Sequence, residues 1–216
     1  MAVQSDYRYS LTVNGSSQFE VVRFVLKEHL STLFRLELDL ASFGAEPNFH
    51  YLIDQPATLT FWQGDEAVRS VNGIVTALNQ GETGFTRTRY HMVIEPSLCR
   101  AGLQTDLRIF QQQDSQKIIE TLLSKNQVSQ SQFHLQTPYW TREYCVQYRE
   151  TDLNFIQRLA AEEGSYYYFE HTNNSHILHF SNSTTLSEKK GNLVYNAMPA
   201  GQRPEAAVWH WAYEEK

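Results

Sequence analysis

The sequence predicts a mainly β protein with an α+β insert: a small antiparallel β-barrel, then an α/β module, then the start of a second barrel. Three observations lead to this prediction. Strand-like alternation of apolar and polar residues fills the first hundred positions, helical periodicity appears only after Pro96, and two tryptophans alternate in a strand-like stretch near the end. The expected divisions are residues 1–100, 101–192 and 193–216.

Six segments before Pro96 have the two-residue period of half-buried strands. They are Tyr7–Val13, Phe19–Leu26, Phe34–Leu40, Ala57–Trp62, Val68–Leu78 and Phe85–Glu95. Asn14-Gly15 predicts a tight hairpin turn, because both residues tolerate positive φ. Gly73 interrupts the fifth segment and predicts a bulge or sharp bend, by which a sheet curls and closes. Together these signals favour a barrel or sandwich.

Two helices are predicted in the second part of the chain. Asp114 or Ser115 can cap the first, which ends near Lys125-Asn126, and its apolar stripe consists of Ile118, Ile119, Leu122 and Leu123. Thr151 can cap the second, and Gly164 stops it. Strands are expected at Glu143–Tyr148, Ser165–His171 and His176–Phe180. This mixture is typical of an α+β module.

The last part of the chain has the pattern of a connection followed by a strand. Residues 181–192 are polar and predict a loop, and Ala206–Tyr213 is apolar. Trp209 and Trp211 share one strand face, so we expect this strand to pair with a further element, which would place it in an incomplete second barrel.

Composition narrows the possible partners and compartments. Eighteen Lys and Arg against twenty-four Asp and Glu give a net charge of −6, which argues against nucleic acid as a partner. Cys99 and Cys145 are too few for a stapled secreted scaffold and favour a reducing compartment. The N-terminus has no Sec-type signal pattern, and the apolar runs are far shorter than a membrane span. We expect a soluble protein made in the cytoplasm.

The sequence offers no convincing catalytic or phosphate-binding motif. Phosphate-loop and dinucleotide glycine patterns are absent. The segment around Ser165 superficially matches a nucleophile elbow, but it runs from helix to strand and lacks the second glycine. Glu162 and Glu163 diverge on a helix and suit a solvated face, and both cysteines are interpreted as small core residues. We therefore expect no enzyme activity, no catalytic residue, no cofactor and no small-molecule substrate.

Three histidines near a predicted hairpin are the best metal candidates. His171 and His176 can meet across the hairpin, but His179 points to the opposite face from His176, so the three cannot converge on one ion without a bulge. We interpret them as ordinary half-exposed strand histidines and expect no metal site.

Four successive aromatic residues, Tyr166 to Phe169, make the most informative strand. Tyr166 and Tyr168 lie on one face, and Tyr167 and Phe169 on the other. A strand that is apolar on both faces is buried in the core, covered by another subunit, or used as a ligand platform. We select Tyr166, Tyr168, Trp209 and Trp211 as possible interface residues.

The run from Val146 to His171 resembles the signature of VgrG proteins, the spike of the bacterial type VI secretion machine. Three earlier parts resemble the family in the same order: Val21–Phe24 with Leu30–Leu36, Gln55–Leu59 through Asn72–Val75, and Tyr90–Pro96 followed by Leu107–Gln111. The resemblance covers nearly the whole chain. One departure is Ser165, where the family usually has an aliphatic residue, and the larger one is length, because family members continue into a neck and a needle.

The resemblance implies the fold of a phage baseplate hub and a mechanical function. Three chains would form the base of a spike in which residues 1–100 dock on a hexameric Hcp-type tube, and sheath contraction would drive the assembly through membranes. It implies a homotrimer for the full-length protein, with effector or spike-tip proteins bound through the part beyond this sequence. The spike would assemble in the cytoplasm and be translocated out of the cell or into a target cell. We expect these 216 residues alone to be monomeric or weakly associated.

Three alternatives stay open at this point. The same fold can serve as the hub of a phage or prophage tail. A spike-associated glycan hydrolase would require a two-carboxylate or nucleophile site in a cleft. A carbohydrate-binding module would use exposed aromatic residues, so that Tyr166→Ala or Trp211→Ala would abolish glycan binding.

Overall fold

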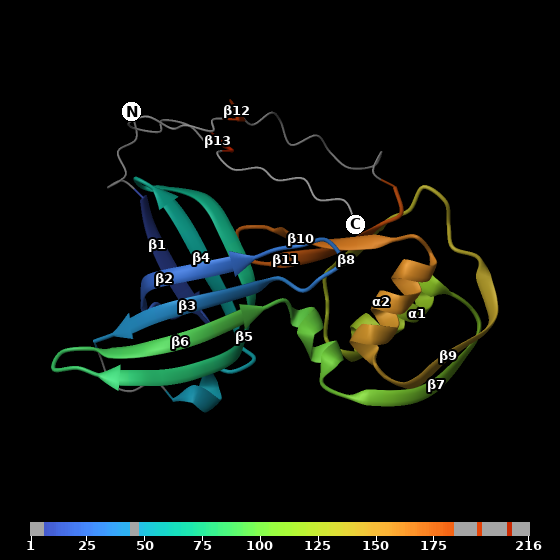
Figure 1. The fold of residues 1–216 in the computed structure, drawn as a ribbon, viewed down its shortest axis with the longest axis horizontal. Coiled ribbons are helices and arrows are strands. Elements are labelled where there is room, and N and C mark those ends of the chain that lie inside the picture. The colour runs from blue at the N-terminus through green and yellow to red at the C-terminus, as the bar shows by residue number, and fades with distance from the viewer. Residues whose placement is uncertain (1–6, 44–47, 184–193, 196–206, 209–216) are drawn as a thin grey trace.

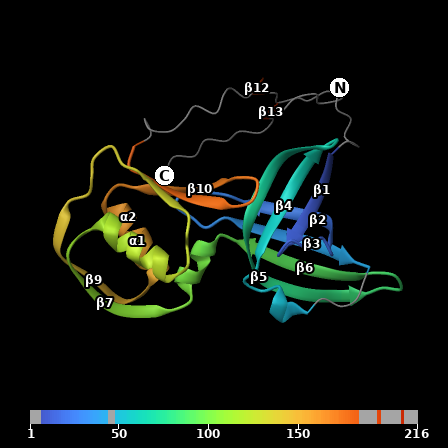
Figure 2. The same ribbon diagram turned by 180° about the vertical axis from the view of Figure 1, so that it is seen from behind.

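A computed structural model describes residues 7–43, 48–183, 194–195 and 207–208 of the chain. Figure 1 shows two units side by side: a strongly curled sheet, and a helical unit that strands cover on the outside. Figure 2 shows the same arrangement from behind. The mainly β class with an α+β insert is confirmed. No helix in the described part of the chain is both long and apolar enough to cross a lipid bilayer.

The first unit is one antiparallel sheet in the order β1-β4-β5-β6-β3-β2. Its strands are β1 (Tyr7–Val13), β2 (Glu20–Lys27), β3 (Arg35–Ser42), β4 (Pro56–Gln63), β5 (Glu66–Thr83) and β6 (Thr88–Glu95). A short 3-10 helix, η2 (Phe49–Tyr51), precedes β4. The sheet curls until its edge strands approach each other, since the rings of Tyr9 on β1 and Phe24 on β2 lie 5.0 Å apart.

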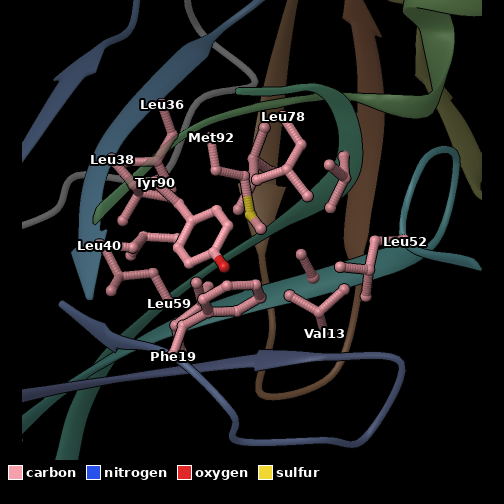
Figure 3. Close-up of a cluster of buried hydrophobic side chains, with 14 of the residues drawn as sticks. Val13, Phe19, Leu36, Leu38, Leu40, Leu52, Leu59, Leu78, Tyr90 and Met92 are labelled. Atoms are coloured by element: carbon pink, nitrogen blue, oxygen red, sulfur yellow. The ribbon is translucent and has the colours of Figure 1, made fainter. Parts of the chain in front are cut away.

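Alternation places one face of the curled sheet in the core, as predicted. Leu36, Leu38 and Leu40 of β3 are buried, whereas Glu37 and Asp39 between them are not. Figure 3 shows these leucines converging with residues from other strands, among them Phe19, Leu59, Tyr90 and Met92. The predicted turn is also confirmed, since Asn14 and Gly15 both have positive φ.

Gly73 lies where β5 changes partners. The strand pairs with β4 up to Ile74 and with β6 from Ile74 onward. A Cβ on Gly73 would lie 2.6 Å from the Glu95 carbonyl oxygen and 2.6 Å from Ile94 Cγ2, so only glycine permits this close approach. The three irregularities in the ladders of β5 lie elsewhere, at Phe61/Trp62, Val75/Ala77 and Gln80/Thr83. Gly73 therefore marks a sharp bend rather than a bulge.

The second unit surrounds two helices with strands. Its elements are η3 (Ser97–Gly102), β7 (Thr105–Asp114), α1 (Ser115–Lys125), β8 (Ser131–His134), β9 (Thr141–Thr151), α2 (Asp152–Glu162), β10 (Tyr166–His171) and β11 (His176–Ser181). Strands β7 and β9 form a two-stranded antiparallel ribbon, and β10, β11 and β8 form a three-stranded sheet. The apolar stripes of α1 and α2 pack between these sheets as a second core.

The predicted helix ends are confirmed. The Asp114 side chain accepts a hydrogen bond from the Lys117 N–H, and the Thr151 side chain accepts one from the Asn154 N–H. Gly164 has a φ of +65°, which suits the stop after α2.

Strands β7 and β8 were not among the predicted strands, and β7 is a seventh strand before the first α-helix, in addition to the six predicted before Pro96. Strand β7 has only a short alternating stretch, in which Leu107 and Ile109 face outward and Phe110 faces the core, followed by three glutamines. Strand β8 has only four residues and pairs in parallel with β11, a non-local partner that no local pattern indicates. Of the predicted strand Ala206–Tyr213, only β13 (Ala207–Val208), paired with β12 (Val194–Tyr195), lies within the described residues.

Candidate functional site

The β10–β11 hairpin connects the two cores of the molecule. Phe169 on β10 packs against the core of the curled sheet and also against the core around the helices. Phe34, which is buried in the first core, makes edge-to-face contacts with Phe169 and with two histidines of the hairpin. The hairpin is thus held by apolar packing from both units.

Asn72 fixes the tip of this hairpin to the curled sheet. Its Nδ2 donates to the carbonyl oxygens of Thr172 and Ser175, at 2.7 and 3.0 Å. Its backbone N–H donates to His171 Nδ1 at 3.1 Å, and its Oδ1 accepts a 2.8 Å hydrogen bond from the Thr58 hydroxyl. Asn72 is only 3% exposed. A buried amide with all its hydrogen bonds satisfied makes a directional connection between two units.

The loop before β3 holds β10 from another side. The Ser31 N–H donates to the Tyr167 carbonyl oxygen at 2.8 Å, and the Tyr167 N–H donates to the Ser31 hydroxyl at 3.4 Å. Tyr167 is buried, and its hydroxyl accepts a 2.8 Å hydrogen bond from Gln157 on α2. One strand therefore contacts the curled sheet through its backbone and the helical unit through its side chain.

His171 and His176 of the hairpin meet as expected, and two of the three candidate histidines have more deeply buried side chains than expected. His171 and His176 are paired across the hairpin, with ring centroids 6.4 Å apart. The His171 side chain is 8% exposed and that of His179 is 5% exposed, because Phe34 and the Tyr168 ring cover them. The interpretation as half-exposed strand histidines is therefore wrong for the side chains of His171 and His179, whereas His176 is half-buried.

His176 is held in its neutral form. Burial is the main cause that lowers its pKa to about 4, and the neighbouring His171 and Arg100 lower it further. Its Nε2 accepts a 3.2 Å hydrogen bond from the Ser97 N–H, which requires an unprotonated nitrogen. His176 is thus a neutral acceptor at the junction between β6 and η3.

Tyr166 and Tyr168 lie on the face of β10 that points away from Tyr167, as predicted. Their rings stack at 6.3 Å, Tyr168 stacks on His179 at 4.9 Å, and His179 stacks on His134 at 5.1 Å. These rings line an open groove of about 1260 Å³ between the three-stranded sheet and the start of β5. Both tyrosines are half-buried and make further interactions. Trp209 and Trp211 lie outside the described residues.

His179 takes part in a chain of polar contacts beside this groove. Its Nε2 lies 3.1 Å from Glu170 Oε2, and its Nδ1 lies 2.8 Å from His134 Nε2. His171 and His176 lie on the other face of the hairpin, as the strand period predicts. Over the described residues, no three His, Cys, Asp or Glu side chains are grouped so that they could hold a metal ion.

Glu163 is not on a solvated face, which corrects the expectation for the two carboxylates. Arg142 binds Glu162 and Glu163 at 2.8 and 2.6 Å, and the Ser115 hydroxyl donates to Glu163 at 2.6 Å. The Glu163 side chain is only 10% exposed. The carboxylates therefore anchor β9 and α1 to the end of α2.

Both cysteines have raised thiol pKa values, but only Cys145 lies in a core, so the interpretation as small core residues is wrong for the half-buried Cys99. Burial raises the pKa of Cys99 to about 11, and it also raises the pKa of the buried Cys145. Neither thiol is activated as a nucleophile.

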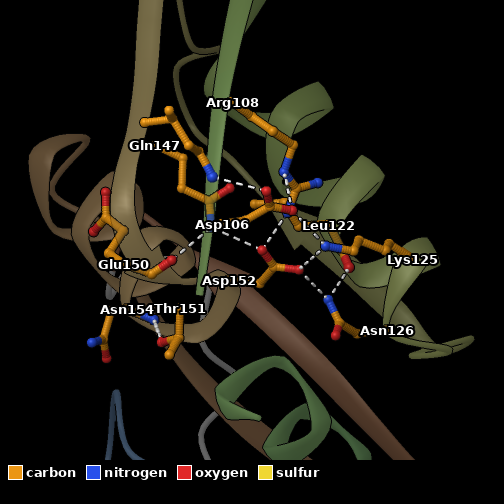
Figure 4. A network of polar contacts seen from close by, with 11 residues as sticks. Asp106, Arg108, Leu122, Lys125, Asn126, Gln147, Glu150, Thr151, Asp152 and Asn154 are labelled. Carbon is orange, nitrogen blue, oxygen red and sulfur yellow. Dashed lines mark hydrogen bonds and ion pairs between the residues drawn. The ribbon is translucent and has the colours of Figure 1, made fainter. Parts of the chain in front are cut away.

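A buried network around Asp152 was not found by sequence reasoning. Figure 4 shows Gln147 on β9 and Asn126 after α1 converging on this carboxylate, each donating at 2.8 Å. Lys125 lies 3.2 Å from it, and Arg108 on β7 donates to it as well. Burial would raise the Asp152 pKa, but the hydrogen bonds from Gln147, Asn126 and Lys125 and the charge of Arg108 together outweigh it, so the pKa is lowered.

The Asp152 network holds α1, α2, β7 and β9 together as one block. The sequence shows only that polar Gln147 alternates with the apolar residues Val146 and Tyr148. In the structure the polar residue is buried and its apolar neighbours are exposed, the reverse of the usual pattern for a half-buried strand.

The geometry therefore defines a protein made of a curled sheet and a helical unit joined rigidly by a hairpin. Residues 27–216 match the family model of the phage tail baseplate hub (GPD), and the chain belongs to this family. The resemblance to VgrG proteins is also confirmed: the chain is 37% identical over 215 residues to the type VI secretion system spike protein VgrG2a of Pseudomonas aeruginosa. That alignment covers 98% of this chain and 26% of the relative, so the chain spans about a quarter of its length.

Solved structures show the same fold. The E. coli c3393 protein, described as a component of the type VI secretion system, matches with a TM-score of 0.77 and 24% identity, over 86% of this chain and 51% of that one. The 43 kDa tail protein of prophage MuSo2 from Shewanella oneidensis matches with a TM-score of 0.60 and 12% identity, over 88% and 57% of the two chains. The fold of a phage tail hub, expected from the resemblance, is confirmed.

Proposed function

We propose that this chain is a structural subunit at the base of a type VI secretion spike. In this proposal, three copies form a collar that caps a hexameric Hcp-type tube, and sheath contraction pushes the collar and its tube through membranes. The support is the likeness to spike proteins over nearly the whole chain, together with the construction of the β10–β11 junction.

The observation that carries the mechanical role is the hairpin that packs into both cores. A part that transmits thrust must resist bending between its units. Here the resistance comes from Phe169 and Phe34 packing and from the hydrogen bonds of Asn72. Close-packed interiors have low compressibility and transmit strain, so no reacting group is needed. Residues 1–100 dock on the tube in this proposal, and effectors or spike-tip proteins bind to the longer protein elsewhere.

The proposal is tested with the complete reading frame that carries this chain. Its deletion is expected to abolish release of the tube protein into the culture medium, and re-expression is expected to restore it. Asn72→Ala in the same frame is expected to lower secretion, whereas Asn79→Ala, at an exposed position of β5, leaves secretion unchanged. Normal secretion in the deletion strain would contradict the proposal.

A second candidate is the hub of a prophage tail, because the matching family model and the MuSo2 tail protein both come from phage tails. The same deletion separates the two. A prophage hub would leave secretion of a tube protein intact and would abolish the release of infectious or tail-bearing particles.

A further inference from the structure

The ribbon of β7 and β9 has an uncovered apolar face. Its inner face packs on the helices through Phe110 and Cys145. On the outer face, Leu107 lies opposite Tyr148, and Ile109 lies opposite Val146. In Figures 1 and 2 the ribbon runs around the outside of the helical unit, at the end away from the curled sheet.

The apolar side chains of this face are largely exposed although both strands are paired. Its apolar side chains are between 39% and 64% exposed; they are Leu107, Ile109, Tyr144, Val146 and Tyr148. The face carries no charged residue in its three central register pairs, since the third pair is Gln111 with Tyr144. An exposed sheet face that is aliphatic and aromatic rather than charged marks a surface that another protein covers.

The area of the face indicates what kind of partner fits. Side chains of these types and exposures present on the order of 500 Å² of surface, within the ~300–600 Å² of the largest patch on a typical monomer. Leu103 and Trp140, just beyond the two ends of the ribbon, are 79% and 74% exposed. With these two residues included, the exposed apolar area of the face approaches the ~800 Å² that each partner buries in a standard interface.

We propose that a second copy of this chain covers the outer face of the β7–β9 ribbon. The inference rests on the proposed function, which requires contacts between copies, and on the area, which suffices for such a contact. The three central register pairs can be buried without desolvating an ion, and one cation, the Arg149 guanidinium 5.4 Å from the Tyr148 ring centroid, lies at the end of the face, which suits a contact between copies of a chain whose net charge is −6. In a three-fold ring the contact is heterologous, so the ribbon of each copy meets a different surface of the next.

The test is sedimentation of the 216-residue chain from about 10 µM to about 1 mM, where contacts of marginal area dissociate. The average mass of the native chain is expected to rise with concentration. Ile109→Lys is expected to weaken this association at least tenfold, because it places a charge at the centre of the face. Val22→Lys is the matched control, at an exposed valine of β2, and is expected to behave like the native chain.

Folding and function are controlled separately. Circular dichroism and the melting temperature should be unchanged in Ile109→Lys, and Tyr148→Ser at the end of the face is a second, milder variant. A native chain that stays monomeric throughout, or an association that both variants leave intact, would overturn the inference. Loss of secretion in the deletion strain with no self-association of the chain would refute only the ribbon contact. Normal secretion in that strain would refute the spike proposal itself.

Discussion

A few residues at the junction make several of the hydrogen bonds that hold the two units together. Asn72 makes four hydrogen bonds that join two strands of the curled sheet to the tip of a distant hairpin. His176 adds a neutral acceptor for the Ser97 N–H a few ångströms away. Asn72 is buried and His176 is half-buried, and removing either one would remove hydrogen bonds that join the two units.

We expect Asn72→Ala to lower the free energy of unfolding by about 2 kcal/mol, since it removes the side-chain hydrogen bonds of a buried amide to Thr58, Thr172 and Ser175. Urea unfolding at neutral pH measures this change. Asn79→Ala, on the same strand but exposed, should change the free energy by less than about 0.5 kcal/mol. Equal effects of the two substitutions would show that the hairpin anchor contributes nothing.

His176 should make the protein acid-sensitive. Its pKa is about 4 in the folded protein and 6.5 as the ordinary value, so the unfolded chain binds the proton more readily. Stability is then fully present above pH 6.5 and falls as the pH drops from 6.5 toward 4. Between pH 7.5 and pH 5 the loss should be about 2 kcal/mol.

The check is to compare the native chain with His176→Gln in urea at both pH values. Gln can still accept the Ser97 N–H but does not titrate, so the variant should lose about 2 kcal/mol less than the native chain over this interval. The same pH dependence in both proteins would assign the acid sensitivity to other groups.

At the level of elements, the long strand β5 determines the shape of the curled sheet. Its first half pairs with β4 and its second half pairs with β6, and the change of partner occurs next to Gly73. Helices α1 and α2 are positioned in a different way, by buried polar groups such as Asp152 and by their capping residues. Backbone geometry thus shapes one unit, and side-chain hydrogen bonds orient the other.

Gly73→Ala should destabilise the protein by roughly 2 kcal/mol or more, because its Cβ would overlap the Glu95 carbonyl oxygen and the Ile94 side chain. Gly81→Ala is the control on the same strand, where the nearest atom to a new Cβ is at 3.6 Å. Thermal unfolding of the two variants gives the comparison. A Gly73→Ala protein as stable as Gly81→Ala would mean that the bend can relax without cost.

At the level of the whole molecule, the two cores share one hairpin. Phe169 belongs to the periphery of both cores, and the Ser31 loop binds the backbone of β10. Such sharing couples the stability of the units, as a load-transmitting part requires. The outer face of the β7–β9 ribbon lies at the opposite end, where a neighbouring copy can contact it without disturbing the hairpin.

We expect the chain to unfold in a single cooperative transition despite its two cores, because neither unit can lose the hairpin independently. Calorimetry should give equal calorimetric and van't Hoff enthalpies. Phe169→Ala should lower the free energy of unfolding by about 3 kcal/mol and make the unfolding of the two units less cooperative. Phe43→Ala, at an exposed position, should change neither the free energy of unfolding nor the cooperativity. Two resolved transitions in the native chain would refute the coupling.

The sequence by itself determined the local elements and the family. Alternation at Phe34–Leu40, the caps Asp114 and Thr151, and the stop at Gly164 act over a few residues, so a linear pattern contains them. The aromatic strand also divided its faces as its period requires.

Only the tertiary structure decided which distant residues meet. The pairing of β8 with β11, the burial of the hairpin histidines, the contacts of Asn72 and the network around Asp152 all join positions far apart in the chain. Each depends on long-range packing, which no local period encodes, because the partner of a buried polar group is chosen by the path of the whole chain.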